Sequence, residues 1–204
     1  MQIYVHARSF FEARQGTKRE RELFRDNRII SINNVSFPAE PPPFSEEFLD
    51  AENLLILYFD DVDEGLPNAM TPEQAREIVN FVRLEDNRPI IVHCTAGISR
   101  SGAVGEVLNW YFNRFETDDS DYRKFEIVHT DIVPNAHVRR LLLAELQRNH
   151  EKLRKKVKVV RLKHLKKQQN QKEVRSCLLT QFHPANLPKG IFMRSRKFLR
   201  LRSF

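Results

Sequence analysis

The stretch that decides the fold is residues 90–111, which read IIVHCTAGISRSGAVGEVLNWY. The apolar run at 90–93 predicts a short buried strand. Gly97 and Gly102 indicate a turn after it, because glycine marks interruptions of regular structure. Apolar residues then recur at helical spacing: Val104, Val107, Leu108 and Tyr111. The stretch therefore predicts a strand, a loop and a helix in direct succession.

The segments around this stretch repeat the alternation of strand and helix. Residues 29–35 (IISINNV) and 54–59 (LLILYF) predict two more strands, and the second is apolar on both faces. Thr71, Pro72 and Gln74 are typical of a helix start, and Pro134-Asn135 precedes another apolar helix. Residues 116–124 (ETDDSDYRK) are expected to be a polar link. We predict an α/β fold with a central, mostly parallel sheet flanked by helices.

The charge of the chain divides it into two regions. Residues 1–146 hold 16 Lys/Arg and 25 Asp/Glu, a net charge of −9. Residues 147–204 hold 18 Lys/Arg and two acids, a net charge of +16. We therefore expect one domain over 1–146 and a basic tail over 147–204, partly helical or disordered.

Composition excludes several classes of protein. The longest apolar run has six residues, far below the ~20 that a membrane helix needs, and no secretory leader is evident. Two cysteines, Cys94 and Cys177, cannot build a disulfide framework, so we expect a cytoplasmic, intracellular protein. The histidines show no metal-ligand spacing, so we expect no metal and no cofactor. We also expect a monomer.

The loop between the predicted strand and helix has the chemistry of a phosphate site. Its backbone amides precede a helix, where unpaired N–H groups and the helix dipole attract an anion. Arg100 adds a planar cation that holds phosphate through two hydrogen bonds. The same field favours the thiolate of Cys94, which would attack phosphorus and form a phosphocysteine. The residues expected to bind phosphate are Thr95, Ala96, Gly97, Ile98, Ser99 and Arg100.

The full string HCTAGISRSG resembles the signature of the protein tyrosine phosphatase superfamily, and within it the dual-specificity branch. The resemblance covers roughly residues 28–146 and leaves out the basic tail. It implies that Cys94 is the nucleophile, that Arg100 binds phosphate, and that Ser101 assists the second step. We expect His93 to orient the loop rather than act as a base. Asn135 either fixes the shape of the loop or only starts a helix.

The resemblance also implies a general-acid aspartate after the strand at 54–59. The leaving oxygen needs a proton, which a carboxylic acid near the phosphate can supply. Asp60, Asp61 and Asp63 are the candidates. The junction of strand and acid matches the family best at Asp61, and Asp63 is the next choice.

Several substrates remain compatible with the sequence. Residues 95–99 carry no positive charge, which favours a phosphorylated protein over a phosphoinositide. We expect a protein phosphatase that acts on phosphotyrosine, with phosphoserine and phosphothreonine as further substrates of a dual-specificity enzyme. An RNA 5′-triphosphatase is one alternative, because the basic tail suits nucleic acid or another anionic surface. A non-catalytic phosphate-binding scaffold protein is the other.

Overall fold

The computed structural model describes residues 1–36, 41–82, 86–114 and 120–149. Residues 150–204 of the predicted tail lie outside the described residues. The division into a domain over 1–146 and a tail therefore stays a prediction. No helix in the described ranges combines the length and the apolar character that crossing a membrane requires.

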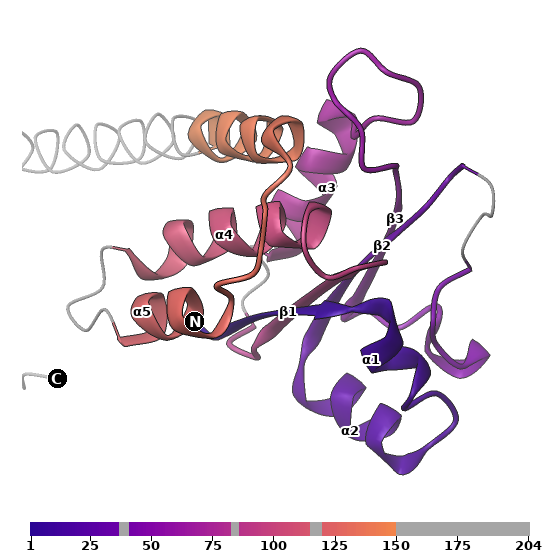
Figure 1. Cartoon of the computed structure of the whole chain (residues 1–204). Helices are drawn as coiled ribbons and strands as arrows, with labels where there is room; N and C mark the ends of the chain where they lie inside the picture. Colours follow the sequence, from indigo (N-terminus) through magenta and orange to yellow (C-terminus); the bar gives the residue numbers. More distant parts are fainter. Residues whose placement is uncertain (37–40, 83–85, 115–119, 150–204) are drawn as a thin grey trace, which may run out of the picture. The chain divides into compact units, whose positions relative to one another are not determined.

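The centre of the fold is a parallel sheet of four strands (Figure 1). Its order is β1 (Ile3–Ala7), β4 (Ile90–Cys94), β2 (Arg28–Asn33) and β3 (Leu54–Tyr58), and every neighbouring pair is parallel. This confirms the predicted α/β class. Because the strands run the same way, their carboxyl ends share one edge of the sheet. Cys94 lies at that edge, level with Ala7 of β1.

Helices cover both faces of this sheet (Figure 1). One face packs against α3 (Pro72–Val82), α4 (Arg100–Asn113), α5 (Ser120–Val128) and a helix over residues 136–149. The other face packs against α1 (Arg8–Glu12), α2 (Lys18–Asp26) and the segment at 44–54, which contains the short 3-10 helix η1 (Glu46–Phe48). The two central strands, β2 and β4, are buried along their whole length. Their apolar residues alternate between the two cores, which explains why these strands read as continuous apolar runs.

The capping residues at the start of α3 form the reciprocal bonds that their spacing predicts. The amide of Thr71 donates to the side-chain oxygen of Gln74 (2.9 Å), and the amide of Gln74 donates to the Thr71 hydroxyl (3.3 Å). Two unpaired donors at the helix start are satisfied in this way. The helix start at Thr71 is confirmed.

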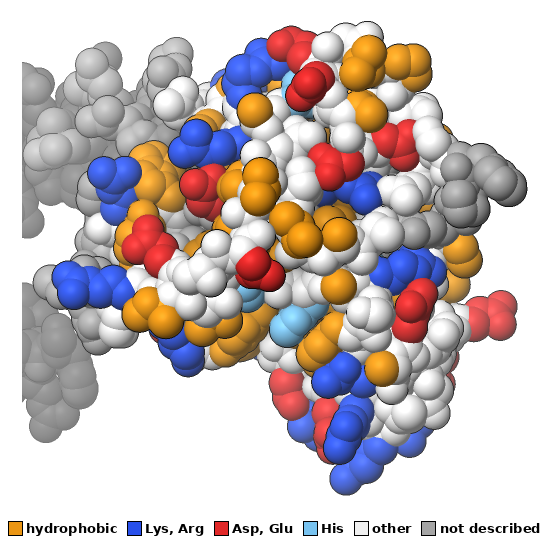
Figure 2. Space-filling model, in the orientation of Figure 1, with side chains coloured by type: hydrophobic (Ala, Val, Ile, Leu, Met, Phe, Trp, Pro, Cys, Tyr) orange, Lys and Arg blue, Asp and Glu red, His pale blue; other side chains and the backbone are white. Residues whose placement is uncertain are grey.

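Several elements differ from the sequence analysis. The expected polar link at 116–124 is wrong in its second half, because α5 begins at Ser120. Phe125 is its one buried residue, so the sequence carries little helical signal. Strand β1 and helix α2 were not predicted either. The surface over α1 and α2 carries both Lys/Arg and Asp/Glu side chains (Figure 2), and only Glu20 and Phe24 of α2 are buried.

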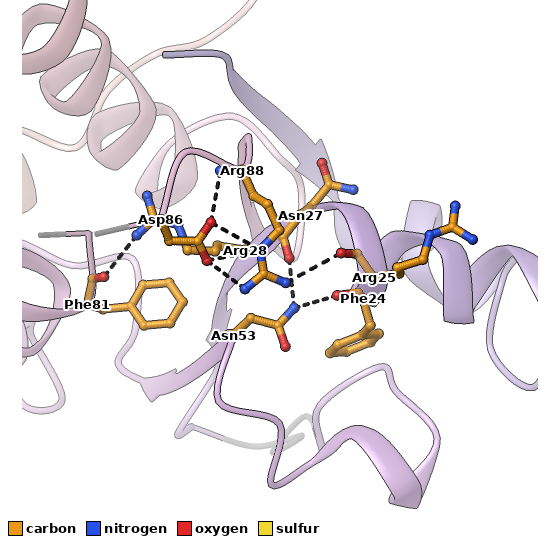
Figure 3. A network of polar contacts seen from close by, with 8 residues as sticks. All are labelled: Phe24, Arg25, Asn27, Arg28, Asn53, Phe81, Asp86 and Arg88. Atoms are coloured by element: carbon orange, nitrogen blue, oxygen red, sulfur yellow. Dashed lines mark hydrogen bonds and ion pairs between the residues drawn. The ribbon is translucent and has the colours of Figure 1, made fainter. Parts of the chain in front are cut away.

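A polar network closes the amino-terminal end of the sheet (Figure 3). The guanidinium of Arg88 binds both carboxylate oxygens of Asp86 and donates to the carbonyl of Arg25 at the end of α2. Asn53, just before β3, donates to the carbonyls of Phe24 and Asn27 (2.6 and 2.7 Å). These bonds connect the segments that enter three strands. The opposite edge, where Cys94 lies, remains available for a site.

Candidate active site

The loop at 95–99 can adopt its path only with glycine at position 97. Gly97 has φ +73°, in the left-handed region that side chains disfavour. A Cβ atom there would lie 2.5 Å from the backbone nitrogen of Ala7 and 2.7 Å from the carbonyl carbon of His6. The end of β1 therefore forms a wall against which the loop packs.

Three carbonyl groups of the loop are bonded to neighbouring segments. The oxygens of Thr95, Ile98 and Ser99 accept hydrogen bonds from neighbouring segments. The donors are the amides of Arg8, Val133, Ala103 and Asn135. Within the described part of the chain, the N–H groups of residues 96–99 have no acceptor. Successive amides left in this state form a concave site for an anion.

Cys94 ends β4 directly beneath this loop. Its side chain is buried, and its sulfur lies 3.1 Å from the hydroxyl oxygen of Ser101 in the first turn of α4. A hydroxyl at this distance can donate to a thiolate. The sequence placed Cys94 and Ser101 in one site, and the structure brings the two atoms into contact.

Arg100 turns inward beside the cysteine. It is only 4% exposed, and its Nη1 donates to the carbonyl of Phe59 (2.8 Å) while its Nη2 donates to the Thr95 hydroxyl (3.0 Å). Its Nε is buried and has no acceptor among the described residues. The guanidinium is thus fixed in orientation and keeps a donor for a ligand.

The three candidate acids occupy different environments. The Oδ1 of Asp61 accepts from the Ser99 hydroxyl and from the Asn135 amide, both at 2.8 Å. Ser99 belongs to the loop at 95–99, which the sequence analysis predicts to bind phosphate. The structure therefore brings Asp61 to this loop. Asp63 is exposed, and its carboxylate makes no hydrogen bond to the described residues. The carboxylate of Asp60 bonds to other segments, at Val35, Ser36 and Asn68.

Asp60 has a structural role. It accepts hydrogen bonds from the amides of Val35 and Ser36, from the Ser36 hydroxyl and from the Asn68 side chain. Burial opposes ionisation of Asp60, but the hydrogen bonds from Ser36, Val35 and Asn68 outweigh it and lower the pKa to about 2. Asp60 is therefore ionised at neutral pH and connects the loop at 34–36 with the loop at 61–69.

We expect Asp60→Asn to destabilise the fold in a way that depends on pH. The folded pKa of about 2 lies below the ordinary 3.8, so the contribution of Asp60 is full above pH 4 and is lost as pH falls toward 2. The free energy of unfolding of the variant should be lower by roughly 2 kcal/mol at pH 7. Denaturant titrations of both proteins between pH 2 and 7 should show this gap narrowing below pH 4. A gap that is constant with pH would contradict the assignment.

His93 lies on the opposite face of β4 from Cys94. Its ring packs against Phe11 (4.5 Å between ring centroids) and Phe44 (5.7 Å). Burial, with the charge of Arg8 as a second cause, lowers the pKa of His93 to about 3. The imidazole is therefore neutral at physiological pH, and its packing fixes the strand end that carries Cys94.

The sequence analysis missed the contribution of the N-terminal segment. Arg8, the first residue of α1, donates its amide to the Thr95 carbonyl (3.2 Å), and its guanidinium contacts Glu12 and Asn33. The only signal in the sequence is the apolar alternation of IYVHA at 3–7, because Ile3 and Val5 face the core.

The described residues contain no group of three or more His, Cys, Asp or Glu arranged to hold a metal. Two open recesses of about 630 and 540 Å³ lie beside α4 and the helix at 136–149. Neither is lined by a residue of the 94–100 loop. Both recesses thus lie away from the loop that carries Cys94 and Arg100.

Comparison with solved structures finds several phosphatases at low sequence identity. PTPMT1, solved in complex with PI(5)P, has 13% identity and a TM-score of 0.46 over 74% of this chain and 94% of its own. Tk-PTP in its active form has 17% identity and a TM-score of 0.40 over 72% and 92%. Human DUSP28 has 18% identity and a TM-score of 0.39 over 76% and 94%. No curated protein matches the sequence significantly.

The comparison with family models is more specific. Residues 62–131 match the model named protein-tyrosine phosphatase. This range contains the whole loop from Cys94 to Arg100 and the helix that follows it. The matched range and the geometry of its loop agree, so residues 62–131 of this chain are similar to the protein-tyrosine phosphatase family.

Proposed function

We propose that this protein is a cysteine-dependent protein phosphatase whose preferred substrate is phosphotyrosine. The observation that carries the proposal is the convergence of Cys94, Arg100 and Asp61 on one loop. Arg100 bonds to Thr95 at the start of the loop, and Asp61 bonds to Ser99 at its end. A thiol, a guanidinium and a carboxylate thus lie around one loop. The amides of residues 96–99 in this loop have no acceptor among the described residues and are available to bind phosphate.

The arrangement supports a two-step hydrolysis. The thiolate of Cys94 attacks phosphorus, the bond to the substrate oxygen breaks, and Asp61 gives its proton to the leaving phenolate. The Asp61 carboxylate then takes a proton from water, whose oxygen attacks the phosphocysteine and releases inorganic phosphate. Throughout both steps the loop amides and Arg100 hold the charged phosphoryl oxygens. Ser101 donates to the sulfur as it leaves.

The surroundings of the loop favour an aromatic phosphate ester. Four of the exposed large apolar residues belong to the segments that border the site: Val35, Leu66, Ile98 and Val133. Val133 donates its amide to the carbonyl of Ile98, so these two are neighbours (3.3 Å). The adjoining loop carries Asp61, Asp63 and Glu64, which would repel a polyanion such as a triphosphate. An apolar border suits the ring of tyrosine, which carries one phosphate.

The substrate class is tested by measuring kcat/KM side by side on three ligands. We expect a phosphotyrosine peptide to be hydrolysed at least tenfold faster than the matched phosphoserine peptide. Comparable rates would instead establish dual specificity. Faster release of the γ-phosphate from 5′-triphosphate RNA would contradict the proposal and favour the RNA alternative. The cytoplasmic location and the monomeric state remain predictions.

The choice of acid is tested by comparing Asp61→Asn with Asp63→Asn. We expect Asp61→Asn to lower kcat for phenyl phosphate by about 100-fold, because phenolate is a poor leaving group that needs the proton. For p-nitrophenyl phosphate, whose leaving group is a weaker base, the loss should be much smaller. Asp63→Asn, which removes an exposed carboxylate without bonds, should stay within about twofold on both. The reverse result would assign the role to Asp63.

A further inference from the structure

The loop that carries Asp61 is attached to the segment at 135–140 at three points. Residues 61–70 lie in the connection between β3 and α3, and residues 135–140 form the start of the last described helix with the residue before it. In the sequence these segments are about 70 residues apart, as the bond between Asn135 and Asp61 shows. The contacts involve the beginning, the middle and the end of the loop.

Asn135 holds the beginning of the loop. Its Nδ2 donates to Asp61 Oδ1 (2.8 Å) and contacts the carbonyl of Val62 (3.4 Å). Its own Oδ1 accepts from the amide of Val138 (2.9 Å), which is the capping bond of a helix start. The orientation of this side chain is therefore set by the helix, and the helix in turn orients the carboxylate.

His137 holds the end of the loop. Its side chain is buried, and its Nε2 lies 2.8 Å from the carbonyl oxygen of Met70. Its Nδ1 lies 3.1 Å from Nη2 of Arg140. Arginine only donates, so Nδ1 is the acceptor and Nε2 carries the hydrogen that is donated to Met70. The imidazole of His137 thus bonds on both sides.

Arg140 holds the middle of the loop. Its Nη2 lies 2.5 Å from Glu64 Oε2, and both side chains are more than half exposed. An exposed ion pair contributes little by itself, about 0–1 kcal/mol. Here the same guanidinium nitrogen also binds His137, so Arg140 joins the exposed and the buried contact.

The loop is also closed upon itself. The amide of Asp60 donates to the carbonyl of Asn68 (2.8 Å), and the Asn68 side chain donates back to Asp60 Oδ2 (3.1 Å). Because the loop ends are joined, a displacement at Met70 or Glu64 is transmitted to Asp61 rather than absorbed between them.

We infer that His137 and Arg140 are positioning residues that hold the acid loop (residues 61–70) over the phosphate loop (residues 95–99), so that Asp61 is in place before substrate binds. The inference rests on the proposed function, because it assigns these residues a role through Asp61. Neither residue touches Cys94 or the phosphate loop in any bond found among the described residues. Small displacements matter for proton transfer, since an error of about 1 Å can cost roughly 100-fold in rate.

Two pairs of variants test this. His137→Leu removes both bonds, whereas His137→Gln keeps an N–H that can reach the Met70 carbonyl. Arg140→Ala removes the bonds to Glu64 and His137, whereas Arg139→Ala, at 53% against 54% exposure, removes only the ion pair with Glu106 of α4. Each variant is assayed with phenyl phosphate and with p-nitrophenyl phosphate.

We expect His137→Leu to lower kcat for phenyl phosphate by about tenfold and for p-nitrophenyl phosphate by less than about twofold. Arg140→Ala should lower the ratio of kcat for phenyl phosphate to kcat for p-nitrophenyl phosphate by about threefold. KM should be unchanged in both variants. His137→Gln should recover most of the loss, and Arg139→Ala should leave the ratio as in the wild type. A loss of folded protein would lower both rates equally, so the ratio isolates positioning. Equal losses on the two substrates would overturn the inference.

The Asp61→Asn background separates this inference from the proposed function. If His137 acts through Asp61, adding His137→Leu to Asp61→Asn should cause no further loss on phenyl phosphate. A further tenfold loss in the double variant would overturn the inference and leave the role of Asp61 intact. If Asp61→Asn alone has no effect on either substrate, the proposed acid fails, and the inference fails with it.

Discussion

Cys94→Ser is expected to abolish turnover, with kcat falling by 10⁴-fold or more, on the order of other nucleophile replacements. The hydroxyl would occupy the position of a sulfur that now lies 3.1 Å from Ser101 at the base of the loop. A serine hydroxyl is a far weaker nucleophile than a cysteine sulfur. The measurement is single-turnover release of phosphate from p-nitrophenyl phosphate, with folding checked by thermal denaturation.

Binding should survive this substitution. In the proposed mechanism the phosphate contacts come from the amides of residues 96–99 and from Arg100, which Cys94→Ser leaves in place. Calorimetric titration with inorganic phosphate should therefore give a Kd within a few-fold of the wild type. Cys177→Ser is the matched control and should retain full activity. Substantial turnover by Cys94→Ser would show that the protein hydrolyses phosphate esters by another route.

Arg100→Lys is expected to have the second-largest effect, a fall of about 100- to 1000-fold in kcat/KM. The charge is kept, but the planar arrangement of donors is lost. In the wild type two guanidinium nitrogens are fixed by Phe59 and Thr95, which leaves the Nε–H for the ligand. A lysine ammonium cannot make the two anchoring bonds and also bind phosphate in the same orientation.

The kinetic effects of Arg100→Lys distinguish a role of the planar guanidinium from that of a positive charge alone. Both kcat and the affinity for inorganic phosphate should fall, because in the proposed mechanism Arg100 contacts the phosphoryl group in the ground state and more strongly in the transition state. Arg88→Lys is the control, since Arg88 binds Asp86 at the amino-terminal end of the sheet and should not alter turnover. An Arg100→Lys enzyme that keeps a third or more of the wild-type kcat/KM would contradict the assignment.

The parts of the site that the sequence predicted are those whose geometry is local. The strand at 90–94, the loop and the helix from Arg100 follow one another without interruption, and Gly97 has the positive φ that the loop demands. The reciprocal caps at Thr71 and Gln74 are separated by three residues. Such features depend on bonds between near neighbours, which the order of residues specifies directly.

The parts that the sequence left open depend on contacts between distant segments. Asp61 and Asp63 are two residues apart and chemically identical, and only the bonds from Ser99 and Asn135 distinguish them. No periodicity indicates that His137 would meet Met70, because a histidine at a buried position of a helix is equally typical of an ordinary core residue. The resemblance favoured Asp61, but the contacts that separate it from Asp63 lie outside the reach of local patterns.

By itself the sequence determined the α/β class and strands at 29–35, 54–59 and 90–93, close to the observed β2, β3 and β4, and it predicted a phosphate-binding loop between a strand and a helix. Hydrophobic periodicity and backbone sterics act over a few residues, so these properties are written into short stretches. Only the tertiary structure decided that β1 lies beside β4, that its end confines Gly97, and that the helix at 136–149 holds the acid loop. Those arrangements arise because burial brings together segments about 70 to 90 residues apart, and pairing at that range follows from the packing of the whole sheet rather than from any one stretch.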